Sequence, residues 1–346
     1  MAESTRARPT PDFSLSFADE PILLLFPTYH LLTAAQVAQL LYAKGDGSNY
    51  DPRKYASSRL KPLTDARYLQ ANPMPKIRRF GSTPLVYRLA RRGINYLETA
   101  HGIPYGLRYH SKEGQHSYRY YEHTLSLNEF LIQVALLTRN CPDIHINALV
   151  HERLFKADPA WVRVSVSHPD GTTALQTVKL EPDAWLDLRF GNQLQQCYEI
   201  ECDTGTEQRV KWQTKIASLI SWVEAGAYQK RFHTDSLRFI VVVIPGESIK
   251  IRYQLTTLAD QRTWASKRVD QLRAWTVDEL NRLQMTAYAE FFRFGVFLPQ
   301  TLSPAGLLLG ESFVDLQGSP IAFLEQSLVQ SQVDIQPEEE AARGYL

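Results

Sequence analysis

The sequence predicts an α/β protein, α+β overall, in which a small helical unit with a β-hairpin precedes a larger mixed sheet. Helix-spaced apolar residues reach about residue 65, paired strand-like runs follow at 76–89, and strand-like runs dominate from residue 144. With 346 residues, 44% of them hydrophobic, the chain can form two cores. We therefore expect a flexible leader at 1–20, a first domain at 21–101, a linker at 102–117, an α/β domain at 118–300 and a C-terminal extension with an acidic tail at 301–346.

Positive charge gathers in one segment of the chain. Residues 51–92 hold eleven Lys/Arg against two Asp, a net charge of +9. The other residues hold 27 basic and 35 acidic side chains, a net charge of −8. A solvated charged face is the plain explanation of such a segment. A polyanionic partner is the alternative, and it depends on the fold that carries the charge.

The order of elements in the first domain favours the polyanionic partner. Thr33 is placed to cap a helix at Ala34–Tyr42, and a basic helix follows at about Pro52–Asp65. Strands at Lys76–Phe80 and Leu85–Leu89 then form a hairpin. Helix, turn, basic helix and hairpin are the order of a winged helix-turn-helix, so we predict binding to double-stranded DNA. The expected DNA contacts are Arg53, Lys54, Ser57, Ser58, Arg59 and Lys61 on the helix and Lys76, Arg78 and Arg79 on the wing.

Acidic residues cluster on two neighbouring strands of the second domain. A predicted hairpin joins 184–190 to 197–202, with a turn at Gly191-Asn192. Side chains alternate along a strand, so Asp183 and Asp187 share one face, and Glu199, Glu201 and Asp203 share one face of the next strand. Such a row indicates either a solvated face or a divalent-cation site.

Pro182-Asp183 followed by Glu201-Cys202-Asp203 resembles the PD-(D/E)XK nucleases. In that pattern an Asp and an acid on the next strand hold Mg²⁺, which activates a water near the scissile phosphate. The resemblance implies Asp183, Glu201 and Asp203 as metal ligands and catalytic residues. The chain has an acid, Asp203, where the pattern has its Lys. Lys215 or Lys211, on the helix that follows, is the expected replacement.

Across residues 25 to 300 the chain resembles the replication-relaxation family of plasmids and integrative elements. The resemblance is carried by His123-Thr124-Leu125 with Asn128, Pro182-Asp183, the run from Glu201 to Glu207, and Lys215. It implies a winged helix on a restriction-endonuclease-like domain, in proteins that act in replication or transfer of mobile DNA. It also implies other replication, transfer or transposition proteins as partners.

Two functions stay open at this point: metal-dependent DNA nicking after origin recognition, and a non-catalytic regulator or assembly platform. The acids favour the first, and the displaced Lys favours the second. His123 on an apolar helix face is most simply a hydrogen-bonded core residue. The sequence contains no GxxxxGK[ST] motif and no apolar stretch of membrane-spanning length, so we expect no P-loop ATPase and no membrane partner. Three cysteines without a paired spacing indicate reduced thiols and, with no signal peptide, a cytoplasmic protein.

Overall fold

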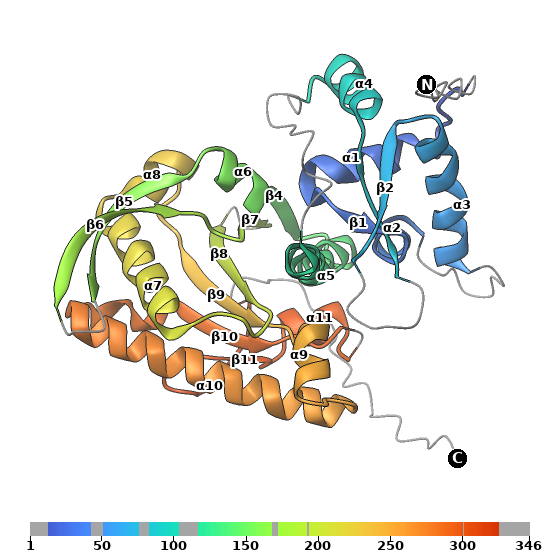
Figure 1. Ribbon diagram of the computed structural model, residues 1–346. Helices are drawn as coiled ribbons and strands as arrows, with labels where there is room; N and C mark the ends of the chain where they lie inside the picture. Colours follow the sequence, from blue (N-terminus) through green and yellow to red (C-terminus); the bar gives the residue numbers. More distant parts are fainter. Residues whose placement is uncertain are drawn as a thin grey trace, which may run out of the picture.

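A computed structural model describes residues 13–42, 51–75, 83–103, 117–167, 172–191, 194–299 and 301–324. A smaller N-terminal unit and a larger part built on a seven-stranded sheet lie side by side (Figure 1). The larger sheet contains both parallel and antiparallel neighbours, and helices cover both of its faces. The predicted α+β class is therefore confirmed. Among the described residues, no helix is long and apolar enough to cross a membrane.

The N-terminal unit packs four helices around a three-stranded sheet of order β1-β3-β2. Thr33 caps α2 as predicted, because its hydroxyl accepts from the backbone N–H of Gln36 while the Gln36 side chain accepts from the Thr33 N–H. Asp51 caps α3 by accepting from the N–H groups of Arg53 and Lys54. The elements are α1 Glu20–Tyr29, β1 Leu32–Thr33, α2 Ala34–Leu41, α3 Pro52–Asp65, β2 Leu69–Pro73, β3 Leu85–Leu89 and α4 Arg91–His101.

The hairpin of this unit begins earlier than the sequence indicated. β2 pairs antiparallel with β3 from Leu69↔Leu89 to Pro73↔Leu85. The Asn72-Pro73 pair suggests a turn, but Pro73 ends the strand, where its missing N–H is tolerated. The strand predicted at Lys76–Phe80 lies outside the described residues. Ala56, Leu60 and Leu63 form the buried side of α3, whereas Tyr55 is exposed.

The large sheet has the order β12-β11-β10-β9-β8-β7-β4. β4, β7 and β8 form an antiparallel meander, and β9 and β10 then continue in parallel with β8. The predicted β7–β8 hairpin is confirmed by the pairing of Ala184 with Ile200. The strands are β4 Ile144–His151, β7 Ala184–Phe190, β8 Gln195–Asp203, β9 Arg238–Val243, β10 Phe292–Val296, β11 Phe313–Val314 and β12 Pro320–Ile321, and β5 Ala160–Ser167 with β6 Thr173–Leu180 forms a separate two-stranded sheet.

Different helices cover the two faces of the large sheet (Figure 1). One face packs on α5, through residues such as Leu186 and Ile200. The opposite face, through residues such as Trp185 and Val241, packs with α7 and α10. The helices are α5 Tyr118–Asn140, α6 Glu152–Ala157, α7 Arg209–Glu224, α8 Ala227–Phe232, α9 Glu247–Arg252, α10 Leu258–Leu283 and α11 Pro304–Leu308.

The C-terminal part contributes to the core, and one expectation about it needs correction. Helix α10 continues to Leu283 and buries Ala265 and Leu272 against the sheet side. The segment expected as an extension from residue 301 adds β11 and β12 to the large sheet and buries Phe313 in the core. The acidic tail lies outside the described residues.

Helix α5 joins the N-terminal unit to the large sheet. Buried Asn128 donates from Nδ2 to the carbonyl oxygens of Tyr29 (3.0 Å) and Leu31 (2.6 Å), just past α1. Gln36 donates to the carbonyl of Leu125 (2.9 Å), and one apolar cluster continues across the junction. The two parts therefore share a core. The predicted linker at 102–117 lies mostly outside the described residues.

Replacing Asn128 by Ala is expected to lower the free energy of unfolding by about 2 kcal/mol, because two buried carbonyl groups lose their donor. The midpoint of urea unfolding measures the change. Asn140→Ala, at the exposed end of the same helix, is the matched control. Equal midpoints for the two variants would contradict this role of Asn128.

Candidate functional site

A pocket of about 510 Å³ opens beside the start of β7. Its walls come from α5, α6, β6 and α7, so the pocket combines segments that are far apart in the sequence. Four chemically active side chains converge there, and four more cations line it. The first group is His123, Glu152, Asp183 and Lys215, and the second is Arg119, Lys156, Lys179 and Lys211.

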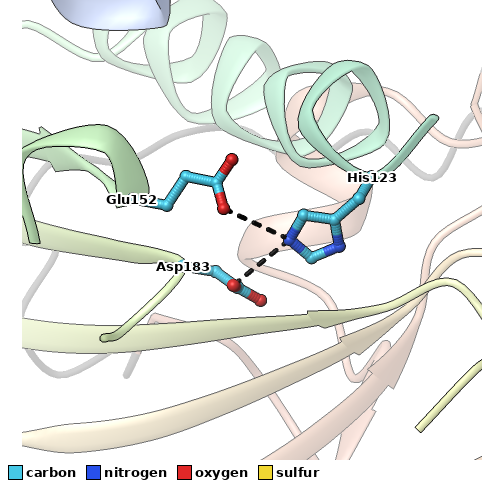
Figure 2. Close-up of side chains that lie close together, drawn as sticks. All are labelled: His123, Glu152 and Asp183. Atoms are coloured by element: carbon cyan, nitrogen blue, oxygen red, sulfur yellow. Dashed lines mark ion pairs between the residues drawn. The ribbon is translucent and has the colours of Figure 1, made fainter. Parts of the chain in front are cut away.

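His123, Glu152 and Asp183 face one another (Figure 2). His123 Nε2 lies 3.2 Å from Asp183 Oδ1 and 3.9 Å from Glu152 Oε2. One ligand atom from each residue can be chosen so that all three lie within 4.8 Å of one another. Each carboxylate is also held by the protein through its other oxygen. Asp183 Oδ2 accepts from the Cys202 N–H (2.8 Å), and Glu152 Oε1 accepts from the Thr124 hydroxyl (2.9 Å).

Lys215 connects this group to the acids of β8. It projects from α7, and its Nζ lies 2.5 Å from Glu201 Oε2. Glu201 is buried, and Glu199, two residues earlier on the same strand face, is fully buried without any exposed surface. Of the two lysines expected from the sequence, Lys215 contacts an acid of β8, whereas Lys211 is exposed.

The charges in the site determine its protonation. Burial alone would lower the pKa of His123, but Asp183 and Glu152 outweigh burial and raise that pKa to about 9. Burial opposes the charge of Asp183, yet His123 and Lys215 lower its pKa. The pKa of Lys215 is raised by Glu201 and Asp183 against the effect of burial. The resting site thus holds a protonated His123 and a protonated Lys215 between carboxylates.

The two neighbouring carboxyls on β8 behave differently from Asp183. Burial raises the pKa of Glu199 to about 7 and also raises the pKa of Glu201. Lys215 lowers the pKa of both, and it contacts Glu201 directly. The Lys215 ammonium therefore favours one negative charge on this pair, whereas burial disfavours a second.

The predicted ligand set of Asp183, Glu201 and Asp203 is not brought together. Asp203 is occupied by Arg268 of α10, whose Nε lies 2.7 Å from Asp203 Oδ2. Along β8, Glu201 meets α7 and Asp203 meets α10, because two helices share that face of the sheet. Among the described residues, His123, Glu152 and Asp183 form the group at ligand distance.

The predicted DNA-contacting residues of α3 are mostly available. Arg53, Lys54, Ser57, Ser58 and Lys61 are exposed, although Lys61 also pairs with Asp65 at 2.8 Å. Arg59 is different, because its guanidinium forms an ion pair with buried Asp19 and donates to Ser16 Oγ. Arg59 therefore joins α3 to the segment before α1. The wing residues Lys76, Arg78 and Arg79 lie outside the described residues.

Glu152 is the site residue that sequence reasoning missed. It directly follows β4, and nothing in its neighbourhood marks it as a ligand. His123 was found only through its place beside Thr124 and Asn128. It pairs with buried Asp183, as expected of a hydrogen-bonded histidine, and it also lines the pocket. Thr124 orients Glu152, and Asn128 docks the N-terminal unit.

The fold and the site define a two-part α/β protein with a histidine, carboxylate and lysine cluster at the edge of a mixed sheet. The chain belongs to the replication-relaxation family, because the model of that family, described as Replication-relaxation, matches residues 27–234. The match includes His123, Glu152, Asp183, Glu201 and Lys215, and it confirms the expected resemblance. The family connects the chain with the replication or relaxation of plasmids and other mobile elements. No curated protein and no solved structure matched the chain.

Proposed function

We propose that the protein binds duplex DNA of a mobile element through its N-terminal unit and nicks DNA in the pocket of Asp183 and Lys215. The single observation that carries the proposal is the convergence of three metal-donor side chains and a half-buried lysine in one pocket that four further cations also line. Such a combination suits phosphodiester cleavage, because a metal ion and a cation stabilise the negative charge that grows on the phosphate during the reaction.

A divalent cation fits the donors His123, Glu152 and Asp183 if it displaces the proton from His123, because only a neutral imidazole coordinates a metal. The second oxygen of each carboxylate is held by Cys202 or Thr124, which orients the first oxygen. Lys156 also contacts Glu152 Oε2, and its side chain is 45% exposed, so it can move aside. Mg²⁺ is the cofactor expected from the nuclease resemblance. Mg²⁺ prefers oxygen ligands only, so Mn²⁺ fits a site that includes the imidazole of His123 better than Mg²⁺ does.

In the proposed reaction, water adds its oxygen to phosphorus, one P–O ester bond breaks, and a hydroxyl end and a phosphate end result. A bound divalent cation would supply Lewis acidity to a phosphate oxygen and to the attacking water. Lys215 stays protonated because Glu201 and Asp183 raise its pKa. We therefore assign Lys215 to stabilising phosphate charge rather than to taking a proton. Lys156, Lys179 and Lys211 are placed to bind the flanking phosphates.

For duplex binding, we propose that the N-terminal unit is a winged helix with α3 as the recognition helix. The order helix, strand, two helices and hairpin supports this proposal, as does the row of exposed residues on α3. The connection between β2 and β3, which contains Lys76, Arg78 and Arg79, would be the wing.

The triple variant K76A/R78A/R79A is expected to weaken duplex binding and to reduce the slope of log affinity against log salt by up to about three, roughly one for each lost phosphate contact. Fluorescence anisotropy with a labelled duplex at several salt concentrations measures both quantities. The control R252A/R262A/K267A removes the same charge from exposed positions on α9 and α10. Binding that is insensitive to salt, or equal losses in both triple variants, would contradict wing binding.

The nicking proposal is tested with supercoiled plasmid carrying the element's own origin, incubated with Mg²⁺ or Mn²⁺. Open-circular product is expected, and EDTA should prevent it. A plasmid that is bound but stays intact with both metals would favour the non-catalytic platform, in which Lys215 and protonated His123 balance the buried acids.

A further inference from the structure

A β-hairpin stands beside the pocket as a sheet of its own. β5 and β6 pair antiparallel along their whole length, next to α7 (Figure 1). Val162, Val164 and Leu180 point inward and join the core formed with α7. The outer face is open to solvent, with Trp161 62% exposed and Leu175 71% exposed. One face of the hairpin therefore stabilises the fold, and the other is exposed in the part of the chain that the structure describes.

The outer face combines an aromatic ring with cations. Trp161 pairs across the strands with Lys179, whose Nζ lies 5.4 Å from the indole centroid, and Arg163 pairs with Thr177. Ser165 pairs with Leu175 farther along the same face. Among these described residues of the outer face, two are basic and none is acidic. An exposed indole flanked by cations is the surface that binds bases by stacking and phosphates by charge.

The outer face continues into the candidate active site. Lys179 lines the same pocket as Asp183 and Lys215, and the chain runs from β6 to Asp183 within three residues of Leu180. A polymer with one phosphate in the pocket would therefore meet Lys179 and Trp161 next.

The hairpin is also held in a fixed position. Ser221 of α7 donates to the carbonyl oxygen of Arg163 (2.9 Å), and Arg282 of α10 donates to that of Ser165 (2.6 Å). The same helix α7 carries Lys215. The spacing between the aromatic surface and the pocket is therefore fixed by the fold, as a binding platform requires.

We propose that the outer face of the β5–β6 hairpin binds an unpaired DNA strand, with a base stacked on Trp161 and phosphates on Lys179 and Arg163. Bases in a duplex are already stacked and paired, so an exposed indole on a flat sheet face gains most from a single strand. The identification of the polymer as DNA rests on the proposed function. The strand that enters the pocket is then already separated, whereas the N-terminal unit holds the neighbouring duplex.

The test uses the full-length protein and a fluorescein-labelled oligothymidine without divalent metal, followed by anisotropy. Trp161→Ala is expected to weaken binding roughly tenfold, since stacking on one aromatic ring is a substantial part of such affinity. Trp161→Phe should retain most of the affinity. Lys179→Ala should weaken binding less and reduce its salt dependence.

Leu175→Ala is the matched control, because it removes an equally exposed apolar side chain from the same face. Thermal melting of each variant verifies that the fold is unchanged, as expected for side chains outside the core. The proposal is overturned if the wild-type protein does not bind oligothymidine at low salt, or if W161A and L175A bind it equally. Cleavage is not needed for this measurement. If the protein binds oligothymidine through Trp161 but does not nick plasmid, only the nuclease proposal is rejected. If it nicks plasmid but W161A binds oligothymidine as well as L175A does, only the proposal for the β5–β6 hairpin is rejected.

Discussion

Asp183→Asn and Lys215→Ala are each expected to reduce the rate of plasmid nicking at least about 100-fold, the usual effect of removing a group that stabilises transition-state charge. Asn keeps the shape of Asp183 and an oxygen for the Cys202 N–H, so the change isolates the lost charge beside His123. Lys215→Ala removes the ammonium group that contacts Glu201. Initial rates of open-circle formation with Mn²⁺ measure both effects.

Each variant has a matched control on the same element. Asp187→Asn changes a buried acid of β7 that hydrogen-bonds Asn147 and Gln195 and does not line the pocket. Arg209→Ala removes an exposed cation at the start of α7 that pairs with Asp278 and does not line the pocket. Both controls are expected to nick within a fewfold of wild type, and all four variants should bind duplex DNA normally. Similar nicking rates for D183N and D187N would contradict a role of Asp183 in the reaction.

Local patterns predicted the parts of the fold that depend on neighbouring residues. Thr33 caps α2 because a capping residue needs only the next helical turn. The acids of β8 share a face because strand alternation is independent of the rest of the molecule. The hairpin of β7 and β8 follows from its turn residues and two apolar runs. All of these features depend only on residues that lie close together in the sequence.

Features that depend on distant elements could not be predicted in the same way. Asp203 is on the same strand face as Glu201, but only the placement of α10 decides that Arg268 reaches it. Glu152 becomes a site residue because β4 pairs with β7 and brings its end next to Asp183. His123 reaches both acids only because α5 lies between the N-terminal unit and the sheet (Figure 1). The spacing of residues in a single sequence does not predict these contacts between distant elements.

His123→Ala and Glu152→Gln are each expected to weaken Mn²⁺ binding by at least about tenfold, because loss even of a residue that only supports a ligand costs that much. Isothermal titration with Mn²⁺ in the absence of DNA measures the affinity directly, independently of any cleavage. His145→Ala, at an exposed position of β4, is the control for removing an imidazole.

Glu201→Gln distinguishes the two ligand sets, since Glu201 belongs to the set predicted from the nuclease pattern and lies outside the group of His123, Glu152 and Asp183. If E201Q loses the metal while H123A and E152Q keep it, the cation belongs to Asp183 and Glu201, and His123 serves as a charged partner of Asp183. If H123A and E152Q lose it and E201Q keeps it, the cation lies where α5, α6 and β7 meet, and Glu201 acts through Lys215.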